Sequence, residues 1–319
     1  FDFTHEGDLF RLKIKHIKGD LRVRFPARRV HWTQVMEMLS EYMSQHQTLS
    51  APERVVDGHD EDAEVMASSG MLLYENRRYS FFHESFFDYV FANSFLDSGK
   101  SICDLLLSAE QHLFRRGQVR QILALQRSED FETYLKNVDE ILRHERIRLH
   151  IKVFLLEWMG ILSAPTTEEL RLLSTLADDE EHSELKQIIW NCLSGQSAWF
   201  DLLDQENYIS KWLTHEDDQW VDHGVWYLRT IQREKADRVA NILLPLYLSD
   251  KEAWAQRLLF IMQWAESGAS RTFFDFFLLL LADGVLDQAR GPIAVNSTFF
   301  DLAYSLPDKR PEWVGELLS

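Results

Sequence analysis

The stretch "RYSFFHESFFDYVFANSFL", from Arg78 to Leu96, decides the fold of the first part of the chain. Its first residues form a short apolar run of the kind found in strands. Apolar side chains then recur at the spacing of a helix, at Phe86, Phe87, Val90, Phe91 and Phe95. A strand that leads directly into a helix is therefore predicted. His83 lies at the junction, where it either caps backbone groups of the helix or contacts a ligand.

A β-hairpin is predicted before this helix, and helices before the hairpin. The runs Met71–Tyr74 and Tyr79–Phe82 flank a polar turn. An amphipathic stripe indicates a helix over residues 32–43, and Ser50-Ala51-Pro52-Glu53 has the spacing of a capping box that opens a short second helix. A third helix starts at Asp60 and ends near Gly70. This order of elements is that of a winged-helix domain, which we expect to extend over residues 1–100.

The segment Phe10–Phe25, "FRLKIKHIKGDLRVRF", alternates apolar and basic residues around a glycine. This alternation predicts an N-terminal β-hairpin in the winged-helix domain. One face would carry Leu12, Ile14, Leu21 and Val23. The other face would carry Lys13, Lys15, Arg22 and Arg24, which are candidate contacts to nucleic-acid phosphates. The alternative is an ordinary solvated face, which is common in hairpins.

Residues 101–319 show helical patterns. Three segments centred on Trp190, Trp226 and Phe260 resemble one another, and their centres lie 36 and then 34 residues apart. Second helices run between them, so the repeating unit is a helix pair. A period of this length predicts an α-solenoid of TPR-like or HEAT-like repeats, whereas an irregular helical bundle is the alternative. The predicted fold class is thus mainly α, a winged-helix domain with small β-hairpins followed by an α-solenoid.

Composition narrows the classes of partner. The net charge of −17 disfavours a protein that coats nucleic acid or an anionic membrane through its overall field. The strongest candidate for a membrane span, Phe273–Ala282, is only long enough for a buried helix. Cys103 and Cys192 lie in apolar helical patterns, so we expect both to act as small buried hydrophobic residues. Free thiols of this kind fit a protein of the reducing cytoplasm. The chain begins at Phe1 with no signal-peptide pattern, so we expect a fragment of a longer protein.

Motifs of catalysis are incomplete. The Gly-Lys-Ser of residues 99–101 resembles the end of a phosphate-binding loop, but Ser94 occupies the position of the earlier glycine and a helix precedes it. The His-Glu of residues 83–84 lacks the second histidine of a zinc-protease site, because Phe87 stands there. We therefore expect no catalytic residue, no metal ligand and no enzyme activity in this chain alone.

The stretch Arg78–Leu96 resembles the end of the winged-helix domain in STAND ATPases of the NACHT type. That family carries an aromatic-x-His-x-Ser-Phe-x-Glu/Asp-Tyr-x-x-Ala pattern. The matching residues here are Phe81, His83, Ser85, Phe86, Asp88, Tyr89 and Ala92. The run Leu113–Arg127, "LFRRGQVRQILALQR", is also similar to bacterial multidomain STAND proteins in which helical repeats follow the winged helix.

The resemblance implies a function for the complete protein. His83 would reach the β-phosphate of ADP bound by an upstream ATPase domain of the same chain, and would latch the inactive state. The repeats would recognise a protein trigger, after which the complete protein would oligomerise and signal, often in antiviral defence in bacteria. ATP and ADP are expected in the complete protein, and neither is expected to bind this chain alone. The alternative is a free-standing helical adaptor whose winged helix binds protein or DNA, although we expect no membrane partner and a nucleic-acid partner is disfavoured.

Overall fold

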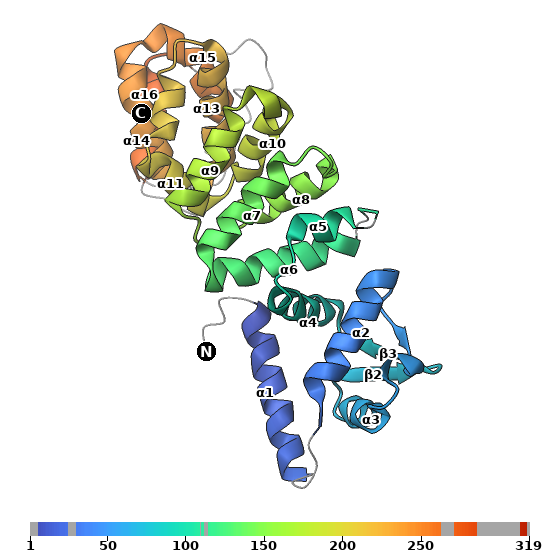
Figure 1. The fold of residues 1–319 in the computed structure, drawn as a ribbon. Coiled ribbons are helices and arrows are strands. Elements are labelled where there is room, and N and C mark those ends of the chain that lie inside the picture. The colour runs from blue at the N-terminus through green and yellow to red at the C-terminus, as the bar shows by residue number, and fades with distance from the viewer. Residues whose placement is uncertain are drawn as a thin grey trace. The chain divides into compact units, whose positions relative to one another are not determined.

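A computed structural model describes residues 6–24, 30–108, 110–111, 114–262, 271–285 and 313–317. The chain divides into two compact units, residues 1–158 and 159–319. It is mainly helical with one small antiparallel sheet, as predicted (Figure 1). Along the described ranges, no helix combines the length and apolar character needed to cross a membrane.

Unit 1 holds the sheet and the helices around it. Its elements are α1 (Glu6–Arg24), α2 (Trp32–His46), β1 (Ala51–Pro52), η1 (Glu53–Val56), α3 (Asp60–Ser68), β2 (Leu72–Glu75), β3 (Arg78–Phe81), α4 (Glu84–Asp97), α5 (Ile102–Leu107), α6 (Phe114–Glu129) and α7 (Phe131–Arg143). The next helix is α8 (Leu149–Gly160). The elements after it are α9 (Thr167–Ala177), η2 (Glu180–His182), α10 (Ser183–Leu193), α11 (Ser197–Gln205), α12 (Tyr208–Leu213), α13 (Asp218–Ile231), α14 (Ala236–Ser249), α15 (Lys251–Met262), α16 (Arg271–Ala282) and α18 (Val314–Leu317).

The predicted hairpin and the helix after it are confirmed. Strands β2 and β3 pair antiparallel, with Leu72 opposite Phe81 and Tyr74 opposite Tyr79. The turn residues Asn76 and Arg77 have φ of 51° and 60°. Positive φ at both central positions matches a type I′ turn, whose twist suits the two strands. Helix α4 begins three residues after the last residue of β3. The stretch Arg78–Leu96 therefore forms a strand and then a helix.

The predicted N-terminal hairpin is wrong, because residues 6–24 form the single helix α1. The same segment also fits a helical period through Phe10, Ile14 and Ile17. Tertiary contacts favour the helix. The ring of Phe10 lies 5.3 Å from that of Phe86 and 5.5 Å from that of Tyr89, so α1 is anchored on α4. Gly19 lies within α1 and makes no turn there.

The capping-box prediction at residues 50–53 is wrong in its detail. Ala51 and Pro52 pair with Tyr79 and Arg78 as strand β1, so the sheet order is β1-β3-β2. The Ser50 hydroxyl accepts a hydrogen bond from Nε of Arg78 at 2.8 Å and caps no helix. The helix that follows is the 3-10 turn η1, of four residues. The helix predicted from Asp60 to Gly70 is confirmed as α3, and Gly70 has φ of +74° just beyond its end.

Helix α4 is the centre of unit 1. It packs against α1, α2, β3 and α6 (Figure 1). The two helices approach closely at Gly117 of α6, where a Cβ atom would lie 2.2 Å from the Oδ2 atom of Asp88. The rings of Phe87 and Phe114 meet nearby, with 5.6 Å between their centroids. The stretches Arg78–Leu96 and Leu113–Arg127 are therefore in contact. The predicted domain boundary near residue 100 falls inside unit 1.

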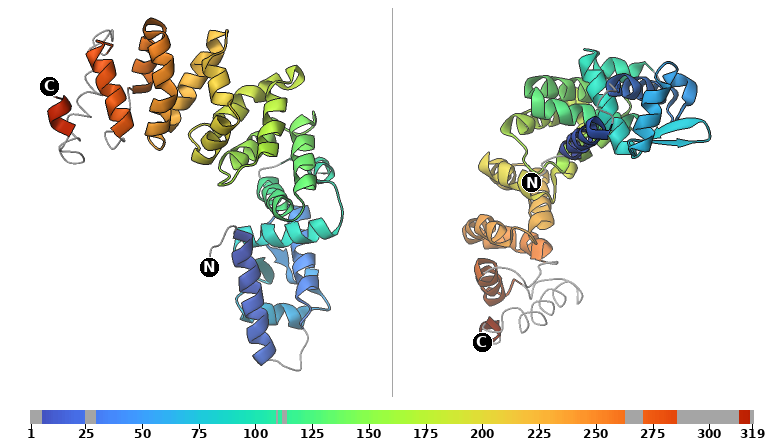
Figure 2. Two further views of the ribbon diagram at one scale, coloured as in Figure 1. Left: turned by 90° about the vertical axis from the view of Figure 1, so that its left-hand side faces the viewer. Right: turned by 90° about the horizontal axis from the view of Figure 1, so that it is seen from below.

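Polar contacts in unit 2 join residues at a recurring separation. The Tyr227 hydroxyl donates to the Leu193 carbonyl, and Arg238 donates to Asp204; both pairs are 34 residues apart. Two further pairs have the same separation, Tyr208 with Ser174 and Lys235 with Asp201. Helices α13 and α15 pack together, as do α14 and α16. In the left view of Figure 2 the yellow to orange helices follow one another in pairs. The recurring separation matches the predicted period.

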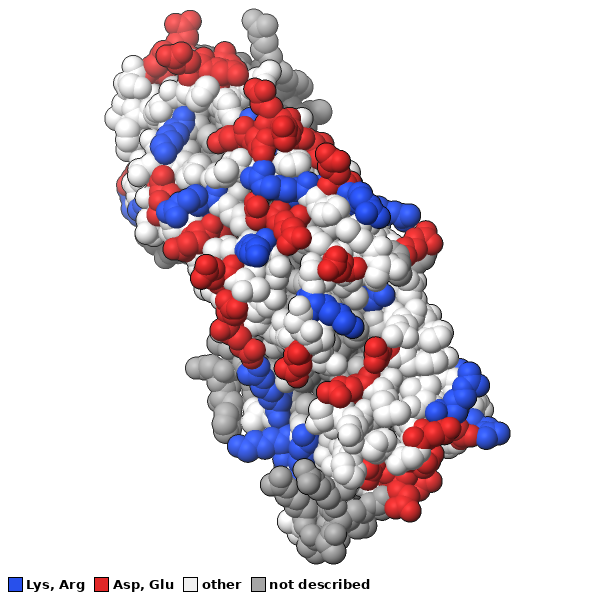
Figure 3. All heavy atoms as spheres, viewed as in Figure 1, with Lys and Arg blue, Asp and Glu red and all other residues white. Residues whose placement is uncertain are grey.

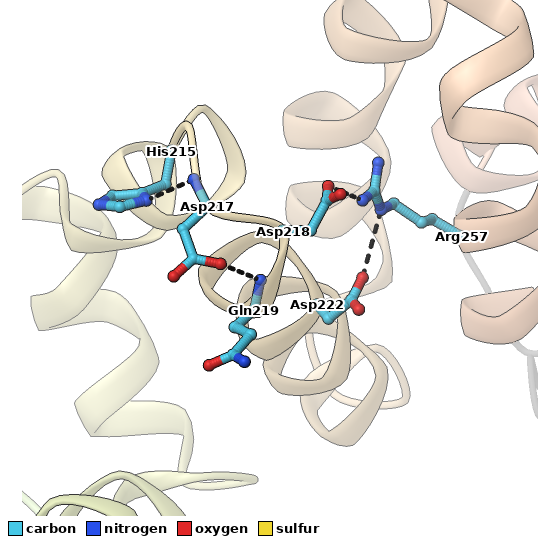
Figure 4. A network of polar contacts seen from close by, with 6 residues as sticks. All are labelled: His215, Asp217, Asp218, Gln219, Asp222 and Arg257. Carbon is cyan, nitrogen blue, oxygen red and sulfur yellow. Dashed lines mark hydrogen bonds and ion pairs between the residues drawn. The ribbon is translucent and has the colours of Figure 1, made fainter.

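The contact between α13 and α15 is partly ionic. Arg257 of α15 donates to Oδ1 of Asp218 at 2.6 Å and to Oδ1 of Asp222 at 3.4 Å (Figure 4). Asp217 caps α13 by accepting from the backbone N–H of Gln219 at 2.9 Å. These acidic side chains in and before the first turn also suit the positive end of the helix. The start of α13 is thus fixed both by its own cap and by the next helix pair.

Aromatic side chains fill the space between α10, α12 and α13. The ring of His223 lies 4.8 Å from that of Trp212, 5.9 Å from that of Trp220 and 6.2 Å from that of Trp190. Its Nε2 atom is buried and has no hydrogen-bond partner among the described residues. Of the three predicted centres, Trp190 is buried, but Trp226 is 37% exposed and Tyr227 takes its place in the core. The helix was predicted correctly, and its buried face is shifted by one residue.

We predict that Gly117→Ala destabilises the protein even though alanine favours a helix. The new methyl group would overlap the Asp88 carboxylate, and overpacking of this kind costs about 1–3 kcal/mol. Gly19→Ala is the matched control, because a Cβ atom there meets nothing within 4 Å. It should stabilise α1 by about 0.5–1 kcal/mol. Urea unfolding of both variants measures the difference, and a Gly117→Ala protein as stable as the wild type would contradict the packing described.

We predict that unit 2 loses stability as the pH falls from about 6.5 to about 4. Burial and the charge of Lys186 lower the pKa of His223 to about 4. The unfolded chain, with a histidine pKa of about 6.5, therefore binds a proton in this window that the folded chain does not, at a cost of roughly 3 kcal/mol. Thermal unfolding followed by tryptophan fluorescence measures the effect. His223→Phe should flatten the pH dependence, whereas His215→Gln, at an exposed site, should leave it unchanged.

Candidate functional site

The candidate site lies at the start of α4, where β3 ends. His83 is the N-cap residue of α4, and its Nδ1 accepts a hydrogen bond from the backbone N–H of Ser85 at 3.2 Å. Because Nδ1 accepts, the neutral ring carries its proton on Nε2. The side chain is exposed, so Nε2 can donate to a group from outside. The capping interaction is thus present, and contact of the same ring with a ligand stays a prediction.

Positive charge surrounds this junction. Helix α4 has 14 residues, and its N-terminus presents the positive end of the helix dipole. Lys13 of α1 holds its Nζ atom 3.2 Å from the ring centroid of Phe82, the residue before His83. Glu84 opposes these charges, since its carboxylate is exposed in the first turn. An imidazole N–H, an ammonium group and a helix N-terminus together favour an anionic group such as a phosphate.

The predicted basic face does not exist as such, because Lys13, Lys15, Arg22 and Arg24 lie on a helix. Successive helical residues are about 100° apart, so Lys13 and Lys15 point to different sides. The side chains of Arg22 and Arg24 lie outside the described residues.

The helix instead places Arg11, Lys15 and Lys18 on one side, where they line a shallow pocket with Tyr89. Figure 3 shows Lys and Arg side chains gathered over α1. Arg11 is already paired with Glu129 of α6. This side of α1 is therefore partly neutralised within unit 1 itself.

Sequence analysis missed a second group, formed by His31, His59 and Asp62. Nδ1 of His31 lies 2.9 Å and Nδ1 of His59 lies 3.6 Å from the same Oδ2 atom of Asp62. Oδ2 also accepts from the backbone N–H of His31 at 3.2 Å. Within the described part of the chain these residues are the one group with ligand atoms close enough to hold a metal ion. The sequence contains no signal for this group, because His31 and Asp62 are 31 residues apart and share no helical or strand pattern.

Asp62 joins the starts of two helices. It lies in the first turn of α3, and His31 immediately precedes α2. Burial raises the pKa of Asp62, but the hydrogen bonds from His31 and His59 outweigh burial and hold the pKa below its usual value. Two imidazoles and a carboxylate are suitable ligands for a transition metal such as zinc. A metal would have to displace the hydrogen bond between His31 and Asp62.

No family model, curated protein or solved structure matches this chain.

We predict that Asp62→Asn destabilises unit 1 by about 1–3 kcal/mol, because charge-assisted hydrogen bonds to His31 are lost. The folded-state pKa of Asp62 is depressed, so its contribution is present above a pH of about 4 and is lost as the pH falls through the folded-state value. Chemical unfolding at pH 7 and at pH 3 measures this. Asp60→Asn is the control, since Asp60 is exposed in the same helix turn. Equal stability of Asp62→Asn and wild type at pH 7 would contradict the prediction.

Proposed function

We propose that this chain is the C-terminal regulatory and ligand-sensing part of a STAND signalling ATPase of the NACHT type. In this proposal residues 1–100 act as the winged-helix domain and the helices after them as TPR-like or HEAT-like repeats. The observation that carries the proposal is His83. It stands exposed between β3 and α4, its Nδ1 is used for capping, and its Nε2–H remains to donate to a phosphate.

The proposed latch would use this exposed Nε2–H. A bond from His83 to the β-phosphate of ADP, held by an upstream ATPase domain of the same chain, exists only in the closed state. Losing that bond shifts the population toward the open state, in which the complete protein oligomerises and switches on an effector. The positive end of α4 and Lys13 favour the same anionic group. This chain contributes the latch, and nucleotide hydrolysis belongs to the upstream domain.

The repeats are proposed to bind a protein trigger. Contacts at a separation of 34 residues support repeating helix pairs whose faces are buried against their neighbours. The visible surface of unit 2 carries Asp and Glu side chains with Lys and Arg between them (Figure 3). Trp226, 37% exposed, and Leu248, 57% exposed, offer apolar contacts on α13 and α14. Tryptophan on a mixed-charge surface is typical of protein recognition.

The alternative, an adaptor that binds DNA through a basic hairpin, has less support. Its four basic residues do not share one face of α1, and Arg11 on that helix is paired with Glu129. An exchange of these four residues for glutamate should therefore leave the affinity for duplex DNA unchanged, which a filter-binding titration at several salt concentrations tests.

We predict that His83→Ala in the complete gene product releases ADP and increases the oligomeric fraction. The control is His16→Ala, an exposed histidine on α1. Bound nucleotide is measured by chromatography after denaturation, and mass by light scattering. A His83→Ala protein that retains ADP as the wild type does would contradict the latch. A coding region with no phosphate-binding loop upstream of this chain would overturn the proposal as a whole.

A further inference from the structure

A pocket of about 570 Å³ lies in unit 1, with walls from α2, α4, α5 and α6. Its volume falls in the range of sites for small molecules, about 300–1,000 Å³. The apolar part of its lining comes from Phe91 and Phe95 of α4 and Leu105 of α5. The pocket is at the opposite end of α4 from His83, so it is separate from the site described above.

The polar lining includes a buried cation, Arg115 of α6. This residue is only 4% exposed, and burial lowers the pKa of its guanidinium. Its Nη1 donates to the Ser44 hydroxyl at 2.6 Å and to the amide oxygen of Gln118 at 2.8 Å. Arg115 forms no ion pair with a carboxylate among the described residues, and its Nε and Nη2 donate to none of them. A desolvated charge without a counter-ion is costly in a folded protein.

Two further donors line the same pocket. The hydroxyl of Ser94 on α4 makes no hydrogen bond with the described residues, and Lys100, between α4 and α5, carries an exposed ammonium group. Two carboxylates, Glu41 and Asp104, also line the pocket, and both residues are exposed. Exposed charges are screened by solvent more strongly than a buried one. The pocket therefore presents its least screened charge, a positive one, at Arg115.

We propose that this pocket binds a small molecule carrying a phosphate group, with the phosphate on Arg115, Ser94 and Lys100 and the remainder against Phe91 and Phe95. A guanidinium matches two phosphate oxygens at once through parallel N–H donors. The Ser94 hydroxyl and the Lys100 ammonium group would donate to the third phosphate oxygen. Such a ligand would supply the counter-ion that the protein does not.

Position suggests what binding would do. The pocket is lined by residues of α2, α4, α5 and α6, and α4 packs on α6 in unit 1. A ligand there would contact residues of both helices. A ligand that binds only the folded arrangement stabilises it by mass action. Binding at this pocket would not require His83 or an upstream ATPase domain, because the lining residues all belong to this chain.

The test uses the 319-residue chain. Four titrations are followed by thermal unfolding and by calorimetry. Phenyl phosphate probes the phosphate and the aromatic wall together, inorganic phosphate probes the phosphate alone, benzoate replaces phosphate by carboxylate, and sodium chloride controls for ionic strength. We expect saturable stabilisation by phenyl phosphate, weaker stabilisation by inorganic phosphate, and none by sodium chloride. Benzoate that binds as tightly as phenyl phosphate would overturn the assignment to phosphate.

Variants separate a binding role of Arg115 from a structural one. Arg115→Met should weaken phenyl phosphate binding by about tenfold or more, the loss of a charge-assisted hydrogen bond. Without ligand its stability should change little, because the loss of the hydrogen bonds to Ser44 and Gln118 offsets the gain from removing a buried charge. Arg116→Met is the matched control, since Arg116 lies over the ring of Phe154 and does not line the pocket.

A second pair of variants covers a failure of Arg115→Met to fold. Ser94→Ala and Lys100→Met each remove one donor at residues that are not buried, and each should weaken phenyl phosphate binding while leaving ligand-free unfolding unchanged. The proposal is overturned if the wild type shows no saturable response to phenyl phosphate at about 10 mM, a concentration that would detect affinities weaker than 1 mM. It is also overturned if these two variants bind as the wild type does.

Discussion

The close approach of α6 to α4 at Gly117 is the constraint on which unit 1 depends. Only a glycine lets the Asp88 carboxylate lie where a Cβ atom would come within 2.2 Å of it. Helix α4 also packs against α1, through the rings of Phe10 and Phe86. Helix α2 and strand β3 pack against α4 as well. One helix thus organises the packing of the wing, the N-terminal helix and the helices that follow. His83 lies at the N-terminal end of α4, and the pocket that contains Arg115 is lined by residues of the C-terminal half of α4.

Unit 2 is held together differently. Polar groups join several of its helices, such as the Tyr227 hydroxyl on the Leu193 carbonyl and Arg257 on Asp218. Each of these contacts joins residues of two different helices or their ends. The aromatic cluster around Trp212 adds an interior of rings, and burial there lowers the pKa of His223 to about 4. A buried titratable group of this kind links the folding of the unit to pH.

Charge in this protein is better understood residue by residue than from its total. The net charge of −17 conceals a small number of cations in special positions. Lys13 stands over an aromatic ring at the start of α4, Arg11 is neutralised by Glu129, and Arg115 is buried without a carboxylate among the described residues. Electrostatic interactions gain strength as solvent is removed, so the charge of the buried Arg115 is screened less than the charges of the exposed acidic side chains.

The sequence by itself determined the hairpin and α4, because the turn residues and the change of period from strand to helix are local signals. It also determined the helical nature of the later described residues, since their apolar side chains recur at helical spacing. It did not determine α1, whose alternating and helical patterns compete; contact of Phe10 with Phe86, far along the chain, decides between them. Only the tertiary structure brought together His31 with Asp62, or Arg115 with Ser94, because side chains on different elements meet through packing, which leaves no periodic mark in the sequence.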